Sequence, residues 1–263
     1  MTGTITLANH VQFVGAGPGA ADLLAPRAAR LLSEAEVVLY PGTYLDSELL
    51  AMCSSTAVLI DTQDLDLDTI IAQIVAAQRA GLRVVRLVSG DPRIYSAVFE
   101  QTRRLDSAGV PWSVTPGVPA YSAAAALVGR ELTVPLVTQS VVLTRTHRCS
   151  TAMPQSESLA AFASTRATLV LHLAITQTRS IMTELASPYG SDYPVVIVYR
   201  ASQPQELGLR GTVADIADQV EAAGLRQSAV IVVGRVLADR PDPNGGDSHL
   251  YDPCRDRPAR QVR

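Results

Sequence analysis

The segment VQFVGAGPGAADLLAPRAARLLSEAEVVLYPG, residues 11–42, decides the fold of this chain. It opens with a short apolar run, passes through a glycine-rich turn into an alanine- and leucine-rich stretch, and ends in a second apolar run at residues 37–40. A strand, a helix and a second strand in this order form a βαβ unit with parallel strands. Similar alternation continues along the chain, which predicts an α/β protein with helices packed on its sheets.

The length and the pattern together predict two domains. The chain has 263 residues, and a single core tends to divide above roughly 250 residues. We predict an N-terminal α/β domain over residues 9–118 and a C-terminal α/β domain over residues 119–238. Residues 239–263 are rich in proline and glycine and poor in core-forming residues, so we predict a largely disordered or draped tail.

The charged residues exclude several classes of chemistry. All 22 basic residues are arginines, and the net charge is −3. Without lysine, a Schiff base, a P-loop lysine and a lysine general base are all impossible. Arginine is left as the cation for gripping carboxylates, and the dispersed arginines argue against a nucleic-acid surface.

Other signals are absent from the sequence. No run of about 18 apolar residues occurs, and the first ten residues, MTGTITLANH, lack a basic leader and an apolar segment. We therefore predict a cytoplasmic protein outside the membrane. The three cysteines and four histidines have neither disulfide nor metal-ligand spacing, so no metal is expected. No G-x-S-x-G elbow occurs, which disfavours hydrolysis through a serine nucleophile.

The glycine-rich loop at residues 15–20 follows a strand and precedes a helix, with Asp22 as the expected N-cap. Such a loop could bind a phosphate, and its G-x-G-x-x-A pattern fits the dinucleotide fingerprint loosely. However, Pro18 removes one N–H donor, and the second strand ends in Tyr40-Pro41-Gly42 without an acid for a ribose hydroxyl. A tight turn, or the lining of another cofactor or substrate site, remain the alternatives.

Two further strand ends carry candidate binding loops, SGDP at residues 89–92 and TPGVPA at residues 115–120. Ligands of open α/β sheets bind outside the carboxyl ends of the strands. Asp91 could accept hydrogen bonds from a hydroxyl or an amine, or could only cap the following helix. The small residues after Thr115 leave room for a flat ligand and also allow a helix to pack closely.

A polar loop, Thr144-Arg145-Thr146-His147-Arg148, follows the apolar strand SVVLT. Its hydroxyls, imidazole and guanidinium groups suit a polycarboxylate substrate, and a solvated loop is the alternative. His172 lies in an apolar strand and is interpreted as a core or pocket histidine.

Three motifs together resemble the tetrapyrrole methyltransferases: VGAGPGAADLL at 14–24, SGDPRIYSA at 89–97 and TPGVPAYSAAAA at 115–126. Members of this family transfer the methyl group of S-adenosylmethionine to carbons of corrin precursors, and the resemblance covers about residues 9–238. Within the family, GRELTVPLVTQSVVLTRT at 129–146 is similar to the members that methylate precorrin-4 at C11, giving precorrin-5. The segment SHLYDP, which begins at Ser248, resembles the tail of that subgroup.

The resemblance implies a two-domain homodimer in which each lobe has a mainly parallel or mixed sheet flanked by helices, with S-adenosylmethionine held between the lobes. Many of the implied cofactor contacts would use backbone atoms. By position they are Pro18, Ser89, Gly90, Asp91, Ile94, Pro119, Ala120, Leu173, Ala201, Gly211 and Thr212.

The candidate substrate residues come from the ends of strands and from linkers. Guanidinium groups for the substrate carboxylates are predicted at Arg130, Arg145, Arg148 and Arg200. Candidates for a proton-accepting group are Tyr40, Asp46, Tyr95 and His147. The residues HRCST at 147–151 depart from the glycine-containing turn that is more usual in the family.

Several alternatives remain at this stage. Within the family they are methylation of cobalt-precorrin-4 and of another tetrapyrrole such as uroporphyrinogen III. Outside it, the glycine-rich loop alone supports an NAD-dependent oxidoreductase, and a basic trough could belong to a non-catalytic tetrapyrrole carrier.

Overall fold

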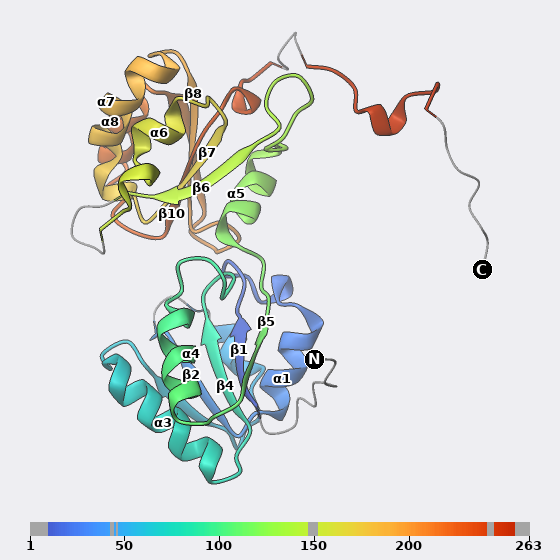
Figure 1. Cartoon of the computed structure of the whole chain (residues 1–263), viewed down its shortest axis with the longest axis vertical. Coiled ribbons are helices and arrows are strands. Elements are labelled where there is room, and N and C mark those ends of the chain that lie inside the picture. Colours follow the sequence, from blue (N-terminus) through green and yellow to red (C-terminus); the bar gives the residue numbers. More distant parts are fainter. Residues whose placement is uncertain (1–9, 43–44, 46, 147–151, 241–244, 256–263) are drawn as a thin grey trace. The chain divides into compact units, whose positions relative to one another are not determined.

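The computed structural model describes residues 10–42, 45, 47–146, 152–240 and 245–255. The chain forms two compact units. Unit 1 comprises Met1–Ala123 and Arg200–Glu206, and unit 2 comprises Ala124–Tyr199 and Leu207–Arg263. Each unit contains one five-stranded sheet flanked by helices, which confirms the α/β prediction (Figure 1).

The sheet of unit 1 is parallel, with the strand order β3-β2-β4-β1-β5. The two central strands, β1 and β4, are buried along their whole length, which explains why their sequences are almost continuously apolar. The strands are β1 (Val11–Gly15), β2 (Val37–Tyr40), β3 (Val58–Asp61), β4 (Val84–Val88) and β5 (Trp112–Thr115).

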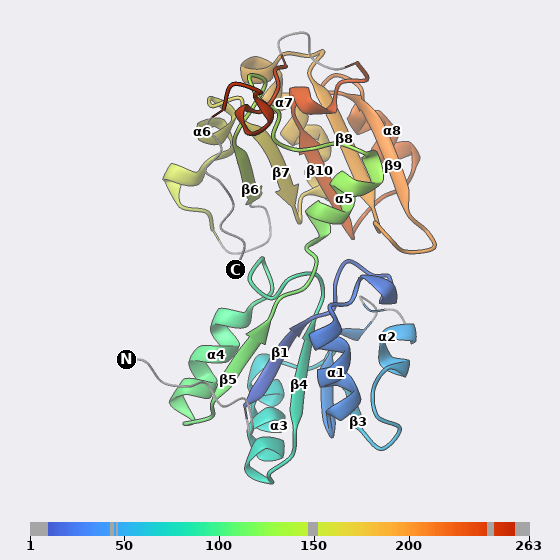
Figure 2. The same cartoon turned by 90° about the vertical axis from the view of Figure 1, so that its right-hand side faces the viewer.

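Helices cover both faces of this sheet (Figure 2). On one face, Leu32 of α1 and Leu49 of α2 pack against Leu87 of β4. On the other face, Ile74 of α3 and Leu105 of α4 pack against residues of β1 and β2. The helices are α1 (Pro26–Glu34), α2 (Ser47–Ala51), α3 (Leu67–Arg79) and α4 (Val98–Ser107).

The first helix differs from its prediction. Instead of one helix after the glycine-rich loop, a 3₁₀ turn at Ala21–Leu23 is followed by two extended residues, and α1 begins at Pro26. Proline fits the first turn of a helix but disfavours helical geometry in the residue before it. The prediction that Asp22 is an N-cap is wrong, because the residue lies inside the 3₁₀ turn, whose N-cap Ala20 makes no side-chain cap.

Unit 2 has a mixed sheet with the order β6-β7-β10-β8-β9. Strands β6 and β7 are parallel, β10 is antiparallel to both β7 and β8, and β8 and β9 form an antiparallel pair. The strands are β6 (Val141–Arg145), β7 (Thr168–His172), β8 (Pro194–Tyr199), β9 (Leu207–Thr212) and β10 (Ala229–Val233).

The core of unit 2 lies between this sheet and helices α6, α7 and α8. Leu185 of α7 and Ile216 of α8 are fully buried there, together with Ile197 and Ile231 of the sheet. The helices of the second half of the chain are α5 (Ala120–Val128), α6 (Leu159–Ala163), α7 (Thr178–Tyr189) and α8 (Ile216–Ala222). The boundary between the two units, Ala123 to Ala124, falls within α5.

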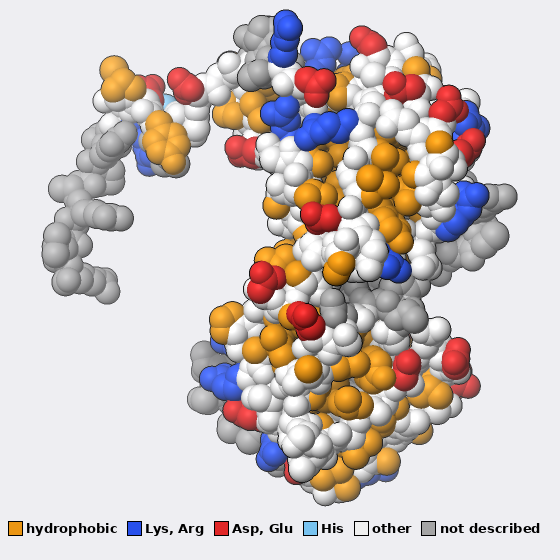
Figure 3. Space-filling view, turned by 180° about the vertical axis from the view of Figure 1, so that it is seen from behind, with side chains coloured by type: hydrophobic (Ala, Val, Ile, Leu, Met, Phe, Trp, Pro, Cys, Tyr) orange, Lys and Arg blue, Asp and Glu red, His pale blue; other side chains and the backbone are white. Residues whose placement is uncertain are grey.

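Part of the predicted tail is described. The N–H of Gly246 donates to the carbonyl of Pro135, 3.1 Å away, and His249–Tyr251 forms a 3₁₀ turn. On the face drawn in Figure 3, acidic and basic side chains are interspersed, and no single basic patch is visible. Within the described residues, no helix is long and apolar enough to cross a membrane, and no group of metal-ligating side chains occurs.

Candidate functional site

Three loops meet at the carboxyl ends of β1, β4 and β5, which are adjacent in the sheet of unit 1. The N–H of Gly17 donates to the carbonyl of Gly90 (3.2 Å), and the N–H of Gly90 donates to the carbonyl of Gly17 (2.8 Å). The chain leaves β1 toward α1 on one face and leaves β4 toward α4 on the other. This is the topological switch point, where open α/β sheets bind ligands. We call residues 15–20, 89–97 and 115–120 the three crevice loops.

The crevice loops touch through their backbones, which requires glycine at two positions. A Cβ added to Gly117 would lie 2.9 Å from the Cα of Gly15 and still closer to the carbonyl oxygen of Gly90. A Cβ on Gly15 would lie 2.6 Å from the Cα of Gly117. Ordinary carbon contacts are about 3.5–4 Å, so no side chain fits between these loops. The loops therefore form one closely packed wall.

Asp91 fastens two of the crevice loops together. Its Oδ1 accepts a hydrogen bond from the N–H of Arg93 (2.7 Å), and its Oδ2 accepts one from the N–H of Gly117 (3.1 Å). The alternative that Asp91 only caps the following helix is wrong, because α4 begins at Val98 and its N-cap is Ala97. The carboxylate is half-buried and keeps further lone pairs for a ligand.

The loop at 89–97 holds an unusual backbone conformation. Gly90, Tyr95 and Ala97 have positive φ values of 67°, 52° and 54°. Tyr95 is 44% exposed, Ile94 is half-buried and Ser89 is exposed. Left-handed conformations cost free energy for residues other than glycine, and they cluster at ligand sites. The geometry of this loop therefore makes it a candidate functional segment.

Most backbone donors of the glycine-rich loop are bonded within the protein. The N–H of Ala16 donates to the carbonyl of Val88 (2.8 Å), and that of Ala20 donates to the Oγ of Ser202 (3.1 Å). The N–H of Gly17 is bonded to Gly90, and Pro18 has none. A phosphate cradle needs such donors to be free. The arrangement disfavours the dinucleotide-binding alternative.

The structure places eight of the predicted cofactor residues in unit 1. All follow the crevice strands or lie on the Arg200–Glu206 segment, which contacts the glycine-rich loop. They are Pro18, Ser89, Gly90, Asp91, Ile94, Pro119, Ala120 and Ala201. Tyr40, a candidate proton acceptor, ends β2 at the same edge of the sheet, and its carbonyl accepts from the N–H and the Oγ of Thr62.

In unit 2, Arg145 and Leu173 lie at one edge of the sheet. Arg145 ends β6 and pairs in register with His172, the last residue of the parallel strand β7. Leu173 follows directly, has a φ of 55° and is 69% exposed, which is unusual for a leucine. Burial lowers the pKa of His172 below its ordinary value of 6.5, which fits the predicted core or pocket histidine.

The predicted cofactor residues Gly211 and Thr212 do not join this edge. Strands β7 and β8 run in the same direction, because both are antiparallel to β10. Thr212 pairs with Pro194 at the start of β8, whereas Leu173 follows the end of β7. The two positions lie at opposite ends of the sheet, and the side chains of Asp215 and Gln219 pack against Gly211. The structure therefore does not bring Gly211 and Thr212 together with Leu173.

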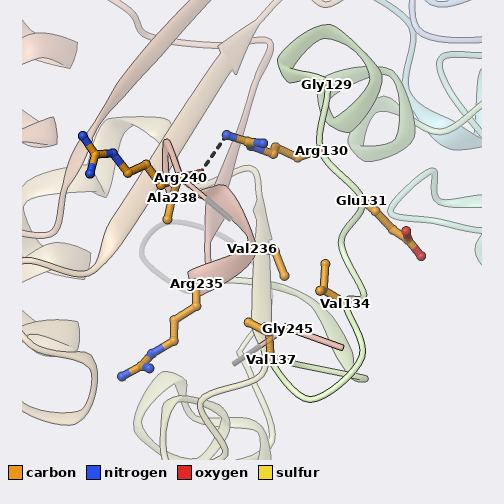
Figure 4. Close-up of a pocket in the computed structure, with 10 residues that line it drawn as sticks. All are labelled: Gly129, Arg130, Glu131, Val134, Val137, Arg235, Val236, Ala238, Arg240 and Gly245. Atoms are coloured by element: carbon orange, nitrogen blue, oxygen red, sulfur yellow. Dashed lines mark hydrogen bonds between the residues drawn. The ribbon is translucent and has the colours of Figure 1, made fainter. Parts of the chain in front are cut away.

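Arg130 also lies apart from Arg145. It lines a cavity of about 290 Å³ in unit 2, and its Nη2 donates to the carbonyl of Ala238 (2.8 Å) (Figure 4). Its Nε is buried without a hydrogen-bond partner among the described residues. The nearby carbonyl of Leu132 accepts from Thr168 at the start of β7, the end of the sheet opposite Arg145. The cavity is lined by Gly129, Arg130, Glu131, Val134, Val137, Arg235, Val236, Ala238, Arg240 and Gly245.

The remaining candidates are Arg200, Asp46, His147 and Arg148. Arg200 has a φ of 46°, and its Nη1 lies 3.4 Å from the Oε1 of Gln205. Asp46, His147 and Arg148 lie outside the described residues.

A buried arginine that was not among the predicted site residues lies beneath the crevice loops. Arg86 of β4 is 8% exposed, and burial lowers its pKa to about 10. Its Nη1 donates to the Oγ of Thr62 and its Nε to the Oε1 of Gln101, both at 3.1 Å. Gln101 in turn donates to the carbonyl of Ala97 (3.1 Å), which supports the 89–97 loop. A charged residue inside the apolar run VVRLV was the signal for it.

The crevice is suited to binding and positioning. Its walls are backbone edges and small or apolar side chains, and its glycine-rich loop has few donors left for phosphate. Tyr40 and Tyr95 are the described candidates for proton transfer. The arrangement favours a group transfer in which the protein mainly holds two reactants in place.

Comparison with known sequences identifies similar proteins along almost the whole chain. The family model described as tetrapyrrole (corrin/porphyrin) methylases matches residues 10–217. The precorrin-4 C(11)-methyltransferase of Rhodococcus erythropolis is 53% identical over 247 residues, which cover 94% of this chain and 98% of that protein. The cobalt-precorrin-4 C(11)-methyltransferase of Priestia megaterium is 36% identical, covering 91% of this chain and 93% of that protein.

Solved structures agree with these matches. A cobalt precorrin-4 methyltransferase aligns with a TM-score of 0.85 at 36% identity, covering 88% of this chain and 97% of the other. A uroporphyrin-III C-methyltransferase from Thermus thermophilus, complexed with S-adenosylhomocysteine, aligns with a TM-score of 0.73 at 29% identity. That alignment covers 87% of this chain and 98% of the other.

Proposed function

The chain belongs to the tetrapyrrole (corrin/porphyrin) methylases, and we propose from this that it methylates precorrin-4 at C11 to give precorrin-5, with S-adenosylmethionine as the methyl donor. One observation carries the choice of reaction. The chain shares 53% identity with a precorrin-4 C(11)-methyltransferase over nearly the full length of both proteins. The geometry of the crevice in unit 1 supports a role in ligand positioning without reference to that relative.

The crevice loops fit this cofactor. S-adenosylmethionine contains an adenosine and an amino acid but no phosphate, and the N–H groups of Ala16, Gly17 and Ala20 in the glycine-rich loop are bonded within the protein. Gly90 and Ala120 have little or no side chain, so a ligand can approach their backbone closely. Asp91 retains lone pairs that can accept hydrogen bonds from a hydroxyl or an amine of the ligand. We assign Pro18, Ser89, Gly90, Asp91, Ile94, Pro119, Ala120 and Ala201 to the cofactor wall. The predicted cofactor contact of Leu173 in unit 2 stays a prediction.

The residues of the chain act by positioning. When bound, S-adenosylmethionine supplies an electrophilic methyl group on a positively charged sulfur. The crevice loops fix the orientation of a bound ligand, because their backbones pack so closely at Gly15 and Gly117 that the loops have no space to move. Alignment of two reactants can contribute about 7–11 kcal/mol to lowering a barrier. Tyr40 and Tyr95 are the described candidates to accept the proton that the substrate releases.

The substrate carboxylates require guanidinium groups. Arg145, at the end of β6, and Arg200, after β8, are the described arginines that we assign to this role. Arg130 is better explained as a structural residue, because it holds the carbonyls of Ala238 and Asp239. The predicted contribution of Arg148 stays a prediction.

We propose the metal-free substrate rather than its cobalt complex. The chain is 53% and 48% identical to precorrin-4 methyltransferases from Rhodococcus erythropolis and Mycobacterium tuberculosis, but 36% identical to a cobalt-precorrin-4 enzyme. A homodimer, which the family resemblance implies, and a cytoplasmic location, which is expected from the sequence, are further parts of this proposal.

Incubation of the purified chain with methyl-labelled S-adenosylmethionine and precorrin-4 tests the proposal. We expect label in a product one methyl group heavier, with the new methyl at C11 by NMR. Parallel reactions with cobalt-precorrin-4 and uroporphyrinogen III decide the substrate. Binding of the tetrapyrrole without label transfer would indicate a carrier, and saturable NAD binding without binding of S-adenosylmethionine would indicate an oxidoreductase.

A further inference from the structure

The segment Arg200–Glu206 holds the glycine-rich loop from a distant part of the sequence. It connects β8 to β9 along the chain, yet its contacts place it in unit 1. The Nε2 of Gln203 donates to the carbonyl of Pro18 (3.0 Å), and the Oγ of Ser202 accepts from the N–H of Ala20 (3.1 Å). The two bonds bracket Gly19 and fix the peptide groups on either side of it.

The side chain of Gln203 also fills the space beside Gly19. A Cβ added to Gly19 would lie 2.6 Å from the Nε2 and 2.8 Å from the Cδ of Gln203. Gly19 has a φ of 153°, a conformation that other residues rarely adopt. Glycine is therefore needed both for the backbone angle and for the close approach of the glutamine.

Hydrogen bonds within the segment hold its backbone in the conformation that directs Gln203 toward the glycine-rich loop. The N–H of Ser202 donates to a carboxylate oxygen of Glu206 (2.9 Å), and the N–H of Gln203 donates to the carbonyl of Arg200 (3.0 Å). Arg200 and Ser202 hold left-handed φ values of 46° and 69°. Such strain persists only where surrounding contacts enforce it. The bracing prepares Gln203 and Ser202 before any ligand arrives.

The held peptide groups belong to the cofactor wall. Pro18 and Ala201 are both assigned to that wall, and they are buried. Pro18 has no N–H, so Gln203 fixes its peptide through the carbonyl. A displacement of about 1 Å at a positioning group can cost about 100-fold in rate.

We propose that Gln203 is a positioning residue for methyl transfer, which sets the Pro18 side of the cofactor wall through its hydrogen bond to the Pro18 carbonyl, with Ser202 as its partner. This inference rests on the proposed function. It assigns to Gln203 no contact with the substrate or with the reacting atoms.

Two substitutions separate the hydrogen bond from the packing. Gln203→Met keeps the length of the side chain and its volume beside Gly19 but removes the donor, and Gln203→Ala removes both. Gln205→Ala is the matched control, because Gln205 lies two residues away, is exposed, and its side chain accepts a hydrogen bond from Arg200 rather than bonding to the glycine-rich loop. Each variant is compared with the wild-type chain by calorimetry with S-adenosylhomocysteine and by steady-state kinetics.

We expect both Gln203 variants to raise the Kd for S-adenosylhomocysteine and the KM for S-adenosylmethionine about tenfold, which corresponds to the loss of one hydrogen bond. The KM for the tetrapyrrole should stay within twofold in the Gln203 variants, and Gln205→Ala should match the wild type in its Kd for S-adenosylhomocysteine. The thermal unfolding temperature and the circular dichroism spectrum of each variant show whether the fold is intact.

The outcomes are distinguishable. A wild-type chain that binds no S-adenosylhomocysteine overturns the proposed function itself. If the wild type binds it and Gln203→Met binds equally well, the hydrogen bond does not position the wall and the inference is wrong. A lower unfolding temperature with unchanged Kd in both variants would give Gln203 a purely structural role, which also overturns the inference.

Discussion

Gly117→Ala is expected to separate the three crevice loops, although it adds one methyl group. The new Cβ would lie 2.9 Å from the Cα and the carbonyl carbon of Gly15 and closer still to the carbonyl oxygen of Gly90. Carbon atoms pack at about 3.5–4 Å, so the 115–120 loop must move by roughly 0.6–1 Å. All the obstructing atoms are backbone, and no flexible side chain can turn away to relieve the contact.

The magnitude follows from two terms. Overpacking of this kind costs about 1–3 kcal/mol, and movement of Gly117 weakens its bond to the Asp91 carboxylate, where loss of such a bond costs about 1.5–3 kcal/mol. We therefore expect a loss of about 2.5–6 kcal/mol in the free energy of unfolding. A displacement near 1 Å in the cofactor wall should also reduce kcat/KM by about 100-fold.

Chemical unfolding and calorimetry with S-adenosylhomocysteine provide the measurement. Gly208→Ala is the matched control, because a Cβ there meets no heavy atom within 4 Å and the residue has no left-handed φ. That variant should be as stable as the wild type or slightly more stable. If Gly117→Ala matches Gly208→Ala in stability and in Kd, the crevice loops are not packed as described and the reasoning fails.

Four other predictions concern single side chains. Asp91→Ala should weaken S-adenosylhomocysteine binding about tenfold or more in calorimetry while the chain remains folded; an unchanged Kd would leave Asp91 without a role in the cofactor site. Arg145→Ala should raise the KM for the tetrapyrrole and leave S-adenosylhomocysteine binding intact, so an equal loss of both would contradict its substrate role. Arg130→Ala should accelerate hydrogen exchange in residues 235–240, because the carbonyls of Ala238 and Asp239 lose their donor, and unchanged exchange would refute this anchoring. Burial lowers the pKa of His172 in the folded chain below 6.5, so the unfolded chain binds a proton at higher pH, and the free energy of unfolding should fall as pH drops from 6.5 through the folded pKa. In urea unfolding, His172→Gln should show a weaker dependence of this free energy on pH. An equal dependence in the variant and the wild type would exclude His172 as the cause.

Local patterns predicted most of the secondary structure. The apolar runs at β1, β2 and β4 needed only hydrophobic spacing, because each strand buries its own residues in the sheet. The break before α1 could have been predicted as well, since Pro26 carries the signal for a helix start.

The candidate site was predicted in part. The motifs placed three loops at strand ends, and the parallel sheet brings them to one edge. The structure does not reproduce two predicted groupings, that of Gly211 and Thr212 with Leu173 and that of Arg130 with Arg145. The first depends on strand direction in the mixed sheet of unit 2, where β10 runs antiparallel to its neighbours. The second depends on the linker before β6, which lies at the start of the parallel strands β6 and β7. A run of apolar residues predicts a strand but carries no sign of its direction.

The sequence by itself determined the strands, the helices, the three crevice-loop motifs and the family, because each is encoded by neighbouring residues or by a motif of fixed spacing. Only the tertiary structure decided that Asp91 joins two loops and that Gln203 holds Pro18 across 185 residues of chain. Those contacts form between segments remote in sequence, where the choice of partner depends on how the whole chain packs. A glutamine among exposed neighbours shows no local pattern that would reveal a positioning residue.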